Sequence, residues 1–401
     1  MQRWKGITVS MIVSLLFLMG ASIALGKSDF VAHNHIERSL HIELLDTSKP
    51  IERFTFQSGL DFEYPDAVRG IYVTGHSAGG ERFETLLDLI ETTDLNAMVI
   101  DVKEDHGKIS FKIDEDSPYA SISENYISDP EALMKTLEEK NIYPIARIVV
   151  FKDTELATSN PEYSFVEQNG EVWKNNRGEA FVNPFMKEVW DYNLDIAKMA
   201  AELGFEEIQF DYVRFPEGFE HRDEDLTYSQ GDYADSDLDN IKRRVEAVTD
   251  FVGYARDELA YYGVDVSVDI FGYAATIPET PGIGQNFSKI SENVDVISSM
   301  IYPSHWSSYF GIEVPDREPY KLVTEYAKVE NEVLGALDEA PVSRPWIQDF
   351  EAPWLYGGGP VQPYGKKEVE DQIRALNENG IDEFLIWNSG NVYTPNVDYT
   401  P

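Results

Sequence analysis

Short runs rich in β-branched and aromatic residues alternate with amphipathic stretches along the chain from about residue 68 onward. The runs predict eight strands, at 68–73, 97–102, 143–149, 207–211, 264–270, 294–301, 345–350 and 383–387. Apolar residues at helical spacing predict helices between them, at 81–91, 130–140, 187–203, 238–262, 319–337 and 366–379. Gly204, Gly263 and Gly380 follow three of these helices, where a left-handed C-terminal cap is needed.

This alternation predicts a parallel sheet, because each strand is joined to the next through a helix. Eight strands in this length fit a closed (β/α)₈ TIM barrel, and a doubly wound open sheet is the alternative. Only fourteen residues follow position 387, so the eighth helix is either missing or supplied by the N-terminal extension. Three connections are longer than packing requires, and they follow the C-terminal ends of strands, where barrels build their active sites. They lie at 152–186, 215–237 and 304–317.

The beginning of the chain has the features of an export signal. Arg3 and Lys5 precede an uncharged, mostly apolar run that ends with the small residues Ala24 and Gly26. We predict a cleaved signal peptide or, because the run is long enough to span a bilayer, an N-terminal membrane anchor. Either outcome implies an extracellular or cell-surface protein. The predicted organisation is an export segment at 1–26, an N-terminal extension at 27–66 and the barrel at 67–395.

The composition narrows the classes of partner. The chain carries 33 Lys and Arg against 72 Asp and Glu, a formal net charge of −39. A charge this negative repels nucleic acid and anionic membrane surfaces, so neither is an expected partner. The lack of cysteine excludes disulfides, thiolate zinc sites and a cysteine nucleophile. The sequence contains no P-loop and no dinucleotide-binding motif, and we expect no cofactor, no metal ion and no obligate protein partner.

Acidic residues stand at the ends of four predicted strands, each among apolar neighbours. Asp211, Asp269 and Asp349 end the fourth, fifth and seventh strands, and Asp101 ends the second. A barrel directs these strand ends to one face, so the carboxylates are expected to lie together. Glycoside hydrolysis requires such a set, because one carboxylic acid protonates the leaving oxygen while a second carboxylate attacks the anomeric carbon or activates water. Any single acid of this kind is equally well explained by a structural hydrogen bond.

Aromatic and polar side chains near the same strand ends are suited to binding a sugar. Aromatic rings pack on the C–H faces of sugars, and polar groups bind the hydroxyls. Taken singly, each aromatic residue is also explained by ordinary packing in the core or in a loop. The candidates for substrate binding are Asp101, Tyr212, Arg214, Tyr302, His305, Trp306, Gln348, Glu351, Trp387 and Asn388.

Three sequence runs resemble one known family. They are Phe-Asp-Tyr-Val-Arg-Phe-Pro at 210–216, Ile-Tyr-Pro at 301–303 and Trp-Ile-Gln-Asp-Phe at 346–350. In this strand order they are similar to the "putative glycosyl hydrolase domain" of bacterial secreted proteins. The resemblance covers about residues 67–395 and implies a (β/α)₈ barrel related to glycosidases.

Acids after the fourth, fifth and seventh strands also resemble the arrangement of the alpha-amylase superfamily. That resemblance implies Asp211 as the nucleophile, Asp269 as the acid/base and Asp349 as a stabilising carboxylate. The chain departs from the superfamily pattern in having Asp where the superfamily has Glu after the fifth strand. Its arginine, Arg214, also follows the nucleophile instead of preceding it. Many barrels pair the fourth strand with the seventh, which would make Asp349 or Glu351 the acid.

A competing motif follows the first predicted strand. Gly75-His76-Ser77-Ala78-Gly79 matches the nucleophile elbow of serine hydrolases, which places a serine between a strand and a helix. No oxyanion loop precedes it, and no histidine lies beyond His305, although histidine usually comes last in that order. The alternative is an ordinary first turn of the barrel, with Gly75 and Gly79 setting its backbone.

The residues together favour a glycoside hydrolase acting on an extracellular or cell-envelope polysaccharide or oligosaccharide. The alternatives are a barrel that binds carbohydrate without cleaving it and a serine esterase that uses Ser77.

Residues 217–239 hold nine carboxylates beside Arg222. We interpret this stretch as a solvated acidic loop, although its composition would also suit a calcium site.

Overall fold

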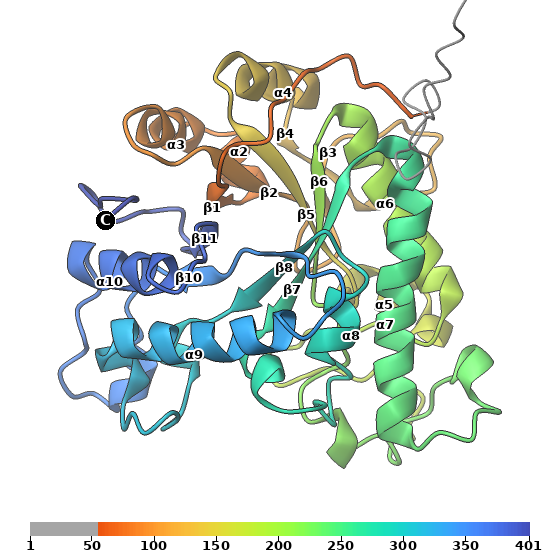
Figure 1. The fold of residues 1–401 in the computed structure, drawn as a ribbon. Coiled ribbons are helices and arrows are strands. Elements are labelled where there is room, and N and C mark those ends of the chain that lie inside the picture. The colour runs from red at the N-terminus through yellow and green to blue at the C-terminus, as the bar shows by residue number, and fades with distance from the viewer. Residues whose placement is uncertain (1–54) are drawn as a thin grey trace, which may run out of the picture. The chain divides into compact units, whose positions relative to one another are not determined.

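Eight parallel strands close into a barrel in the computed structural model, which describes residues 55–401 (Figure 1). The strands are β1 (Arg69–Val73), β2 (Ala97–Lys103), β5 (Tyr143–Val149), β6 (Glu207–Asp211), β7 (Asp265–Phe271), β8 (Val296–Met300), β10 (Trp346–Gln348) and β11 (Phe384–Trp387). Each pairs with the next in this order, and β11 pairs with β1, which closes the ring. All eight predicted strands are confirmed, and closure rules out the open doubly wound sheet.

The predicted export segment at 1–26 lies outside the described residues, as does most of the extension at 27–66.

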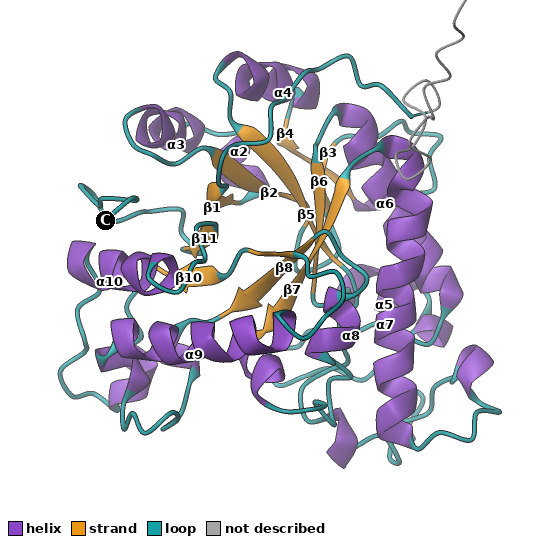
Figure 2. Ribbon diagram, viewed as in Figure 1, coloured by secondary structure: helices purple, strands orange, loops and turns teal. Residues whose placement is uncertain are grey.

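Helices surround the barrel, with their apolar faces against the strands (Figure 2). Local capping explains where several begin: Asp129 accepts a hydrogen bond from Ala132 N, and Asp239 accepts one from Lys242 N. Gly204 has φ +100° and ends α6 in the left-handed conformation, as the sequence predicted. The six predicted helices are confirmed as α3 (Arg82–Glu91), α4 (Pro130–Glu139), α6 (Lys187–Leu203), α7 (Asn240–Leu259), α9 (Pro319–Leu334) and α10 (Lys366–Asn377).

The sequence pattern missed six short elements, because they span too few residues to show a period. They are the helices α2 (Gly75–Ala78), α5 (Thr154–Ser159) and α8 (Phe287–Ser291) and the strands β3 (Ile109–Phe111), β4 (Ser123–Ile127) and β9 (Val342–Ser343). Strand β3 pairs antiparallel with β2, and β4 extends the sheet beyond β3. In the part of the chain that the structure describes, no helix has the length and apolar character needed to cross a bilayer.

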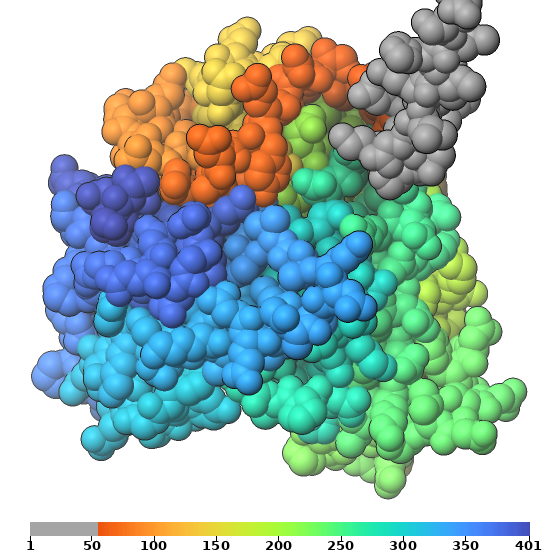
Figure 3. All heavy atoms as spheres, viewed as in Figure 1, coloured from red at the N-terminus to blue at the C-terminus, as the bar shows by residue number. Residues whose placement is uncertain are grey.

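An irregular C-terminal segment, residues 388–401, occupies the place where an eighth helix would follow β11. Its Val397 and Tyr399 side chains are buried, and the Arg82 guanidinium of α3 donates to Asn391 O at 3.3 Å. Figure 3 shows this dark blue segment lying beside the orange surface of α3. Described residues 55–66 contain no helix either. The eighth helix is therefore missing from the described part of the chain, as one of the two predicted alternatives stated.

Two apolar layers flank the strands. Met98 and Ile100 of β2 belong to the large cluster between strands and helices, whereas Ala97 and Val99 belong to a second cluster with Ile145 inside the barrel. This alternation follows from the two-residue period of a strand.

A buried ion network closes the N-terminal end of the barrel. Arg344, which precedes β10, donates to Glu207 at 2.7 Å and to Glu383 at 2.7 Å. Its third partner is the Tyr64 hydroxyl at 2.8 Å, which ties the described end of the N-terminal extension to the strands. Arg344 and Glu207 are both 0% exposed, so each depends on the other for charge compensation.

Arg344→Met should lower the free energy of unfolding by about 3–5 kcal/mol, because it leaves Glu207 buried without its cation. Denaturant unfolding measures the loss. Arg256→Met is the control, since the Arg256–Asp295 pair is partly exposed and its loss should cost no more than about 1 kcal/mol. Equal losses in the two variants would contradict this account.

Candidate active site

The strand registers bring an arginine and three predicted acids to the C-terminal end of the barrel. Asp101 of β2 pairs in register with Arg147 of β5, and Val149 of β5 pairs with Asp211 of β6. Gln209 of β6 pairs with Ser267 of β7. Asp211 and Asp269 each follow these paired residues by two positions, so they lie at the same level on neighbouring strands. All four of these charged residues are buried, with at most 5% of each residue exposed.

Arg147 is the centre of this cluster. Its Nη1 donates to Asp101 Oδ1 at 2.7 Å, its Nε to Asp211 Oδ2 at 3.0 Å, and its Nη2 to Asp105 Oδ1 at 3.0 Å. Nη2 also donates to Asp211 Oδ2 at 2.5 Å, so Asp211 receives two bonds from one guanidinium. The three carboxylates hold the pKa of Arg147 well above its usual range despite its burial. Arg147 therefore remains a permanent cation at the C-terminal end of the barrel.

Asp211 is fixed on both oxygens. Arg147 occupies Oδ2, and the backbone N–H of Tyr212 donates to Oδ1 at 2.6 Å. Tyr212 has φ +53°, a left-handed conformation that is uncommon for an aromatic residue and costs on the order of 1–3 kcal/mol. The strained residue directly after Asp211 turns the chain so that its own N–H reaches the carboxylate.

Asp269 has a different environment. It is 2% exposed, and the indole N–H of Trp346 donates to Oδ1 at 2.7 Å. Burial and the negative charge of Asp211 raise the pKa of Asp269 well above its usual range, and the Trp346 bond and Arg147 offset only part of that rise. The two acids are thus held differently: Asp211 has bonds to both oxygens, whereas Asp269 is buried with a single indole bond and a raised pKa.

Asp101 and Asp105 are charge partners of Arg147 on the β2 side. Burial raises the pKa of Asp101 to about 6, against the opposing effects of Arg147 and of the Tyr72 hydroxyl, which donates at 2.6 Å. Burial alone would also raise the pKa of Asp105, but Arg147 and Lys152 lower it to about 2. Lys152 Nζ lies 2.9 Å from Asp105 Oδ2.

Aromatic rings continue from this cluster to the surface. Tyr72 stacks on Trp387 at 4.1 Å between ring centres, and the Arg147 guanidinium lies 5.5 Å from both rings. Tyr302 contacts Trp387, Phe350 and His305, with ring centres 5.3 to 6.4 Å apart. Phe350 in turn stacks on Trp354, which is 61% exposed. The predicted binding residues Tyr302, His305 and Trp387 thus share one aromatic surface.

The structure places Asp349 apart from the other two predicted catalytic acids. Thr394 donates to both of its oxygens, from N at 2.8 Å and from Oγ1 at 2.6 Å. Burial raises the pKa of Asp349, and these two bonds partly offset the rise. Asn388 also serves this region, because its side-chain amide donates to the carbonyls of Asp349 and Val392. Both residues anchor the C-terminal segment.

Three further predicted binding residues have other surroundings. Trp306 packs on Tyr326 of α9, with ring centres 5.8 Å apart. Gln348 is 0% exposed, accepts from Ser304 N and donates to Asp316 Oδ1. Glu351 is exposed. No hydrogen bond or ring contact among the described residues joins these three to Asp211 or Asp269, and their role in substrate binding stays a prediction.

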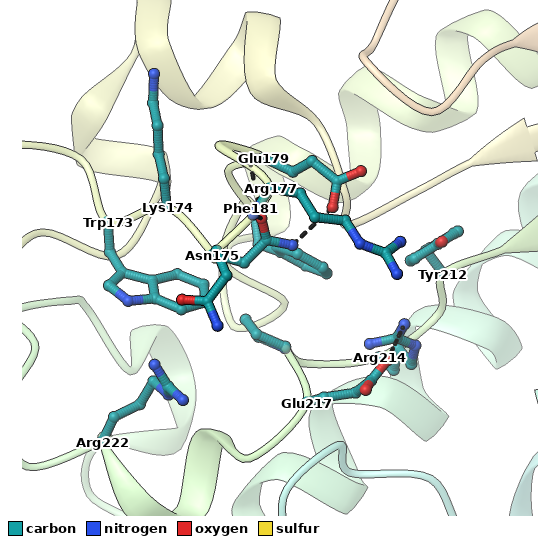
Figure 4. Close-up of a pocket in the computed structure, with 12 residues that line it drawn as sticks. Trp173, Lys174, Asn175, Arg177, Glu179, Phe181, Tyr212, Arg214, Glu217 and Arg222 are labelled. Atoms are coloured by element: carbon teal, nitrogen blue, oxygen red, sulfur yellow. Dashed lines mark hydrogen bonds and ion pairs between the residues drawn. The ribbon is translucent and has the colours of Figure 1, made fainter. Parts of the chain in front are cut away.

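A pocket of about 370 Å³ opens at Tyr212, the residue after Asp211, between the loops that follow β5 and β6 (Figure 4). Tyr212 and Arg214, both predicted to bind substrate, line it. The Arg214 guanidinium lies 4.7 Å from the rings of Tyr212 and Phe271 and pairs with Glu217 at 3.2 Å. Arg214 therefore supports the pocket wall, whereas Arg147 contacts Asp211.

The Gly-His-Ser-Ala-Gly turn has no catalytic arrangement. The Ser77 hydroxyl accepts from Thr74 Oγ1 at 3.1 Å, and no histidine or carboxylate among the described residues bonds to it. His76 stacks on Tyr126, with ring centres 3.7 Å apart. A Cβ at Gly79 would lie 1.9 Å from Tyr126 O, and one at Gly75 would lie 2.3 Å from Ser110 Oγ. The two glycines are needed for close packing of this turn.

The acidic stretch 217–239 is partly paired. Asp223 bonds to Arg244 at 2.9 Å, whereas Glu217, Glu224 and Asp225 are exposed. Within residues 55–401, no group of three or more acidic or histidine side chains comes together in a way that could hold a metal ion.

Sequence reasoning missed Arg147, Tyr72 and the role of Trp346. A signal for Arg147 was present, because it is the one charged residue in the buried run Tyr-Pro-Ile-Ala-Arg-Ile-Val, where an unpaired charge is costly. Tyr72 and Trp346 gave no such signal, since aromatic residues are common in strands.

A closed (β/α)₈ barrel with adjacent, differently held carboxylates at the C-terminal ends of its strands is the architecture of a glycoside hydrolase-like barrel. The chain belongs to the family described as "Putative glycosyl hydrolase domain", which matches residues 70–393. This match confirms the resemblance carried by the three sequence runs.

Several solved structures are similar to this chain, and the first described here shares its fold. The glycoside hydrolase domain of PgaB (BpsB) from Bordetella bronchiseptica covers 81% of this chain and 94% of its own, at 14% identity and a TM-score of 0.56. A hypothetical protein from Ruminiclostridium thermocellum is 32% identical over 50% of this chain and 96% of its own, with a TM-score of 0.42. An alpha-amylase from Lactobacillus plantarum is 14% identical over 81% of this chain and 71% of its own, with a TM-score of 0.49. The chain matches no curated protein.

Trp346→Phe should raise the pKa of Asp269 further, because it removes the hydrogen bond that favours the ionised carboxyl. A ¹³C NMR titration of the Asp269 carboxyl measures the shift. Trp354→Phe is the control, since Trp354 lies at the exposed end of the aromatic surface, and it should leave that pKa unchanged. An unchanged or lowered Asp269 pKa in Trp346→Phe would contradict the assigned role.

Proposed function

We propose that the protein hydrolyses an O-glycosidic bond in an extracellular or cell-envelope polysaccharide, with Asp269 as the general acid and Asp211 as the nucleophile or general base. The observation that carries this proposal is the unequal environment of two neighbouring acids. Asp211 accepts two bonds from Arg147, while Asp269 is buried and has no ion-pair partner among residues 55–401. When the environments of two carboxyl groups push their pKa values apart in this way, one group is suited to act as the acid and the other as the base.

The reaction requires a proton on one side of the scissile bond and a negative charge on the other. Trp346 occupies Asp269 Oδ1, so the proton belongs on Oδ2, from which it passes to the leaving oxygen. Asp211 either attacks the anomeric carbon directly or takes the proton from an attacking water. Arg147 keeps Asp211 in position during either step. The Tyr302, Phe350 and Trp354 rings offer apolar surface to sugar faces next to this pair.

We assign Asp349 a structural role within this proposal, in place of the third catalytic position that the alpha-amylase resemblance implied. Its support is the pair of Thr394 bonds, which tie Asp349 to the C-terminal segment, while no hydrogen bond or ion pair among the described residues joins it to Arg147, Asp211 or Asp269. We also propose that the protein acts outside the cytoplasm, on the evidence of the basic, apolar and small-residue pattern at 1–26.

Asp211→Asn in the full chain should abolish release of reducing ends from a panel of polysaccharides, with the fold intact. Asp269→Asn should lower the rate by about 10²–10⁴-fold, the usual contribution of a general acid. Asp349→Asn is the matched control, and it should lower the melting temperature more than the rate. Full activity in Asp211→Asn would overturn the proposal. Sugar binding without cleavage on every glycan tested would instead identify a carbohydrate-binding barrel.

The rate should fall as pH rises through the pKa of Asp269, because the acid then loses the proton it must donate. Since that pKa is raised well above its usual range, activity should persist well above the pH at which an ordinary aspartic acid ionises. The pH dependence of kcat/KM measures this alkaline limit. A profile whose alkaline limit lies near pH 4 would exclude Asp269 as the acid.

A further inference from the structure

The pocket at Tyr212 carries an excess of positively charged side chains. The proposed reaction gives these side chains no role. Its walls come from residues 173–181, after β5, and from residues 212–222, after β6 (Figure 4). Four cations and two carboxylates belong to this lining: Lys174, Arg177, Arg214, Arg222, Glu179 and Glu217. The chain as a whole carries a net charge of −39, so an excess of cations is unusual for its surface.

Both carboxylates of the lining already have cationic partners. Glu179 pairs with Lys152 at 2.9 Å, and Glu217 pairs with Arg214 at 3.2 Å. Neither Arg177 nor Arg222 forms an ion pair with any residue in 55–401. On a surface rich in carboxylates, two arginines that face one pocket without a carboxylate partner are available to a ligand.

The two arginines are directed at the pocket. The Arg222 guanidinium lies 5.0 Å from the ring centre of Trp173, and its Nε is 3.4 Å from Gly218 O. Figure 4 shows the Arg177 guanidinium extending across the pocket toward Tyr212 and Arg214, whereas Lys174 points away. A guanidinium binds carboxylate, sulfate or phosphate groups through two parallel hydrogen bonds.

We propose that this pocket binds an anionic substituent on the sugar next to the bond that is cleaved, so that the substrate is an acidic polysaccharide. The inference rests on the proposed hydrolase function, because Tyr212 lines the pocket and directly follows Asp211 in the chain. Figure 4 shows the two guanidinium groups on opposite sides of the pocket, with that of Arg177 directed toward Tyr212. An anionic group held by Arg177 places the adjoining glycosidic bond next to Tyr212 and Asp211, and Arg222 holds a second anionic group of the same glycan. A neutral sugar at the same position leaves both guanidinium groups without an anionic partner, and that difference gives the specificity.

The test is a binding titration of the full chain with sodium D-glucuronate, inorganic sulfate and inorganic phosphate, with D-glucose as the neutral probe. At least one anion should bind about tenfold or more tightly than D-glucose. Raising the ionic strength from about 0.1 M to about 1 M should weaken that binding, because the Debye length falls from about 10 Å to about 3 Å. Preference for glucuronate indicates a uronate-containing glycan, and preference for sulfate or phosphate indicates a glycan that carries that group.

Arg177→Gln and Arg222→Gln should each weaken anion binding by about tenfold while the melting temperature stays near that of the wild type. Arg256→Gln is the charge-matched control, because Arg256 lies on α7 outside the pocket lining, and it should leave binding unchanged. Equal affinity for D-glucose and all three anions overturns the proposal, as does anion binding that neither arginine substitution weakens. None of these probes contains a glycosidic bond, so this result is independent of the Asp211→Asn hydrolysis test. Arginine-dependent binding in a chain that cleaves no glycan refutes the hydrolase function and leaves the anion site in place.

Discussion

A buried guanidinium at the C-terminal end of the barrel determines how the surrounding groups are held. Arg147 links β2, β5 and β6 through Asp101 and Asp211, and it reaches Asp105 in the loop beyond β2. Two carboxylates this deeply buried would be strongly destabilising without a cation. Asp101 and Asp211 can therefore be accommodated there only because Arg147 compensates their charge. Its face also contacts the Tyr72 and Trp387 rings. The position of Asp211 and the aromatic surface therefore depend on the same side chain.

Arg344 and Arg147, the buried arginines at the two ends of the barrel, bond to their neighbouring acids in different ways. At the N-terminal end, Arg344 is 0% exposed and bonds to Glu207, Glu383 and Tyr64, so the buried Glu207 has a cationic partner. At the C-terminal end, Arg147 compensates Asp211 but does not pair directly with Asp269, whose pKa stays raised. An apolar layer that includes Val99 and Ile145 separates the two networks. The network at the N-terminal end pairs its buried cation with two carboxylates, whereas Asp269 at the other end has no direct ion pair with Arg147.

Most of the fold could be predicted from the sequence, because each barrel strand is a distinct apolar run between helices with clear periods. The elements missed, such as β3 and α2, are short and exist through tertiary contacts rather than local pattern. The candidate site was predicted only in part. Strand-end position identified Asp211 and Asp269, since a barrel sends all such ends to one face. It could not separate them from Asp349, because that distinction depends on Thr394, 45 residues away in the chain. Nor could it show that Arg147, and not the nearby Arg214, contacts Asp211, because the contact crosses from one strand to its neighbour.

Closure of the ring through β1 and β11 has a consequence for the order of folding. The register pairs Arg69 with Phe384, so the first and last barrel strands meet only after nearly the whole matched domain is available. Contacts this distant in sequence form late, because the entropy of closing the intervening chain must be overcome first. Arg344 and Glu383 stand just before the last two strands, and until these strands dock, Glu207 faces water. The ion network at the N-terminal end is therefore completed only when the last two strands dock.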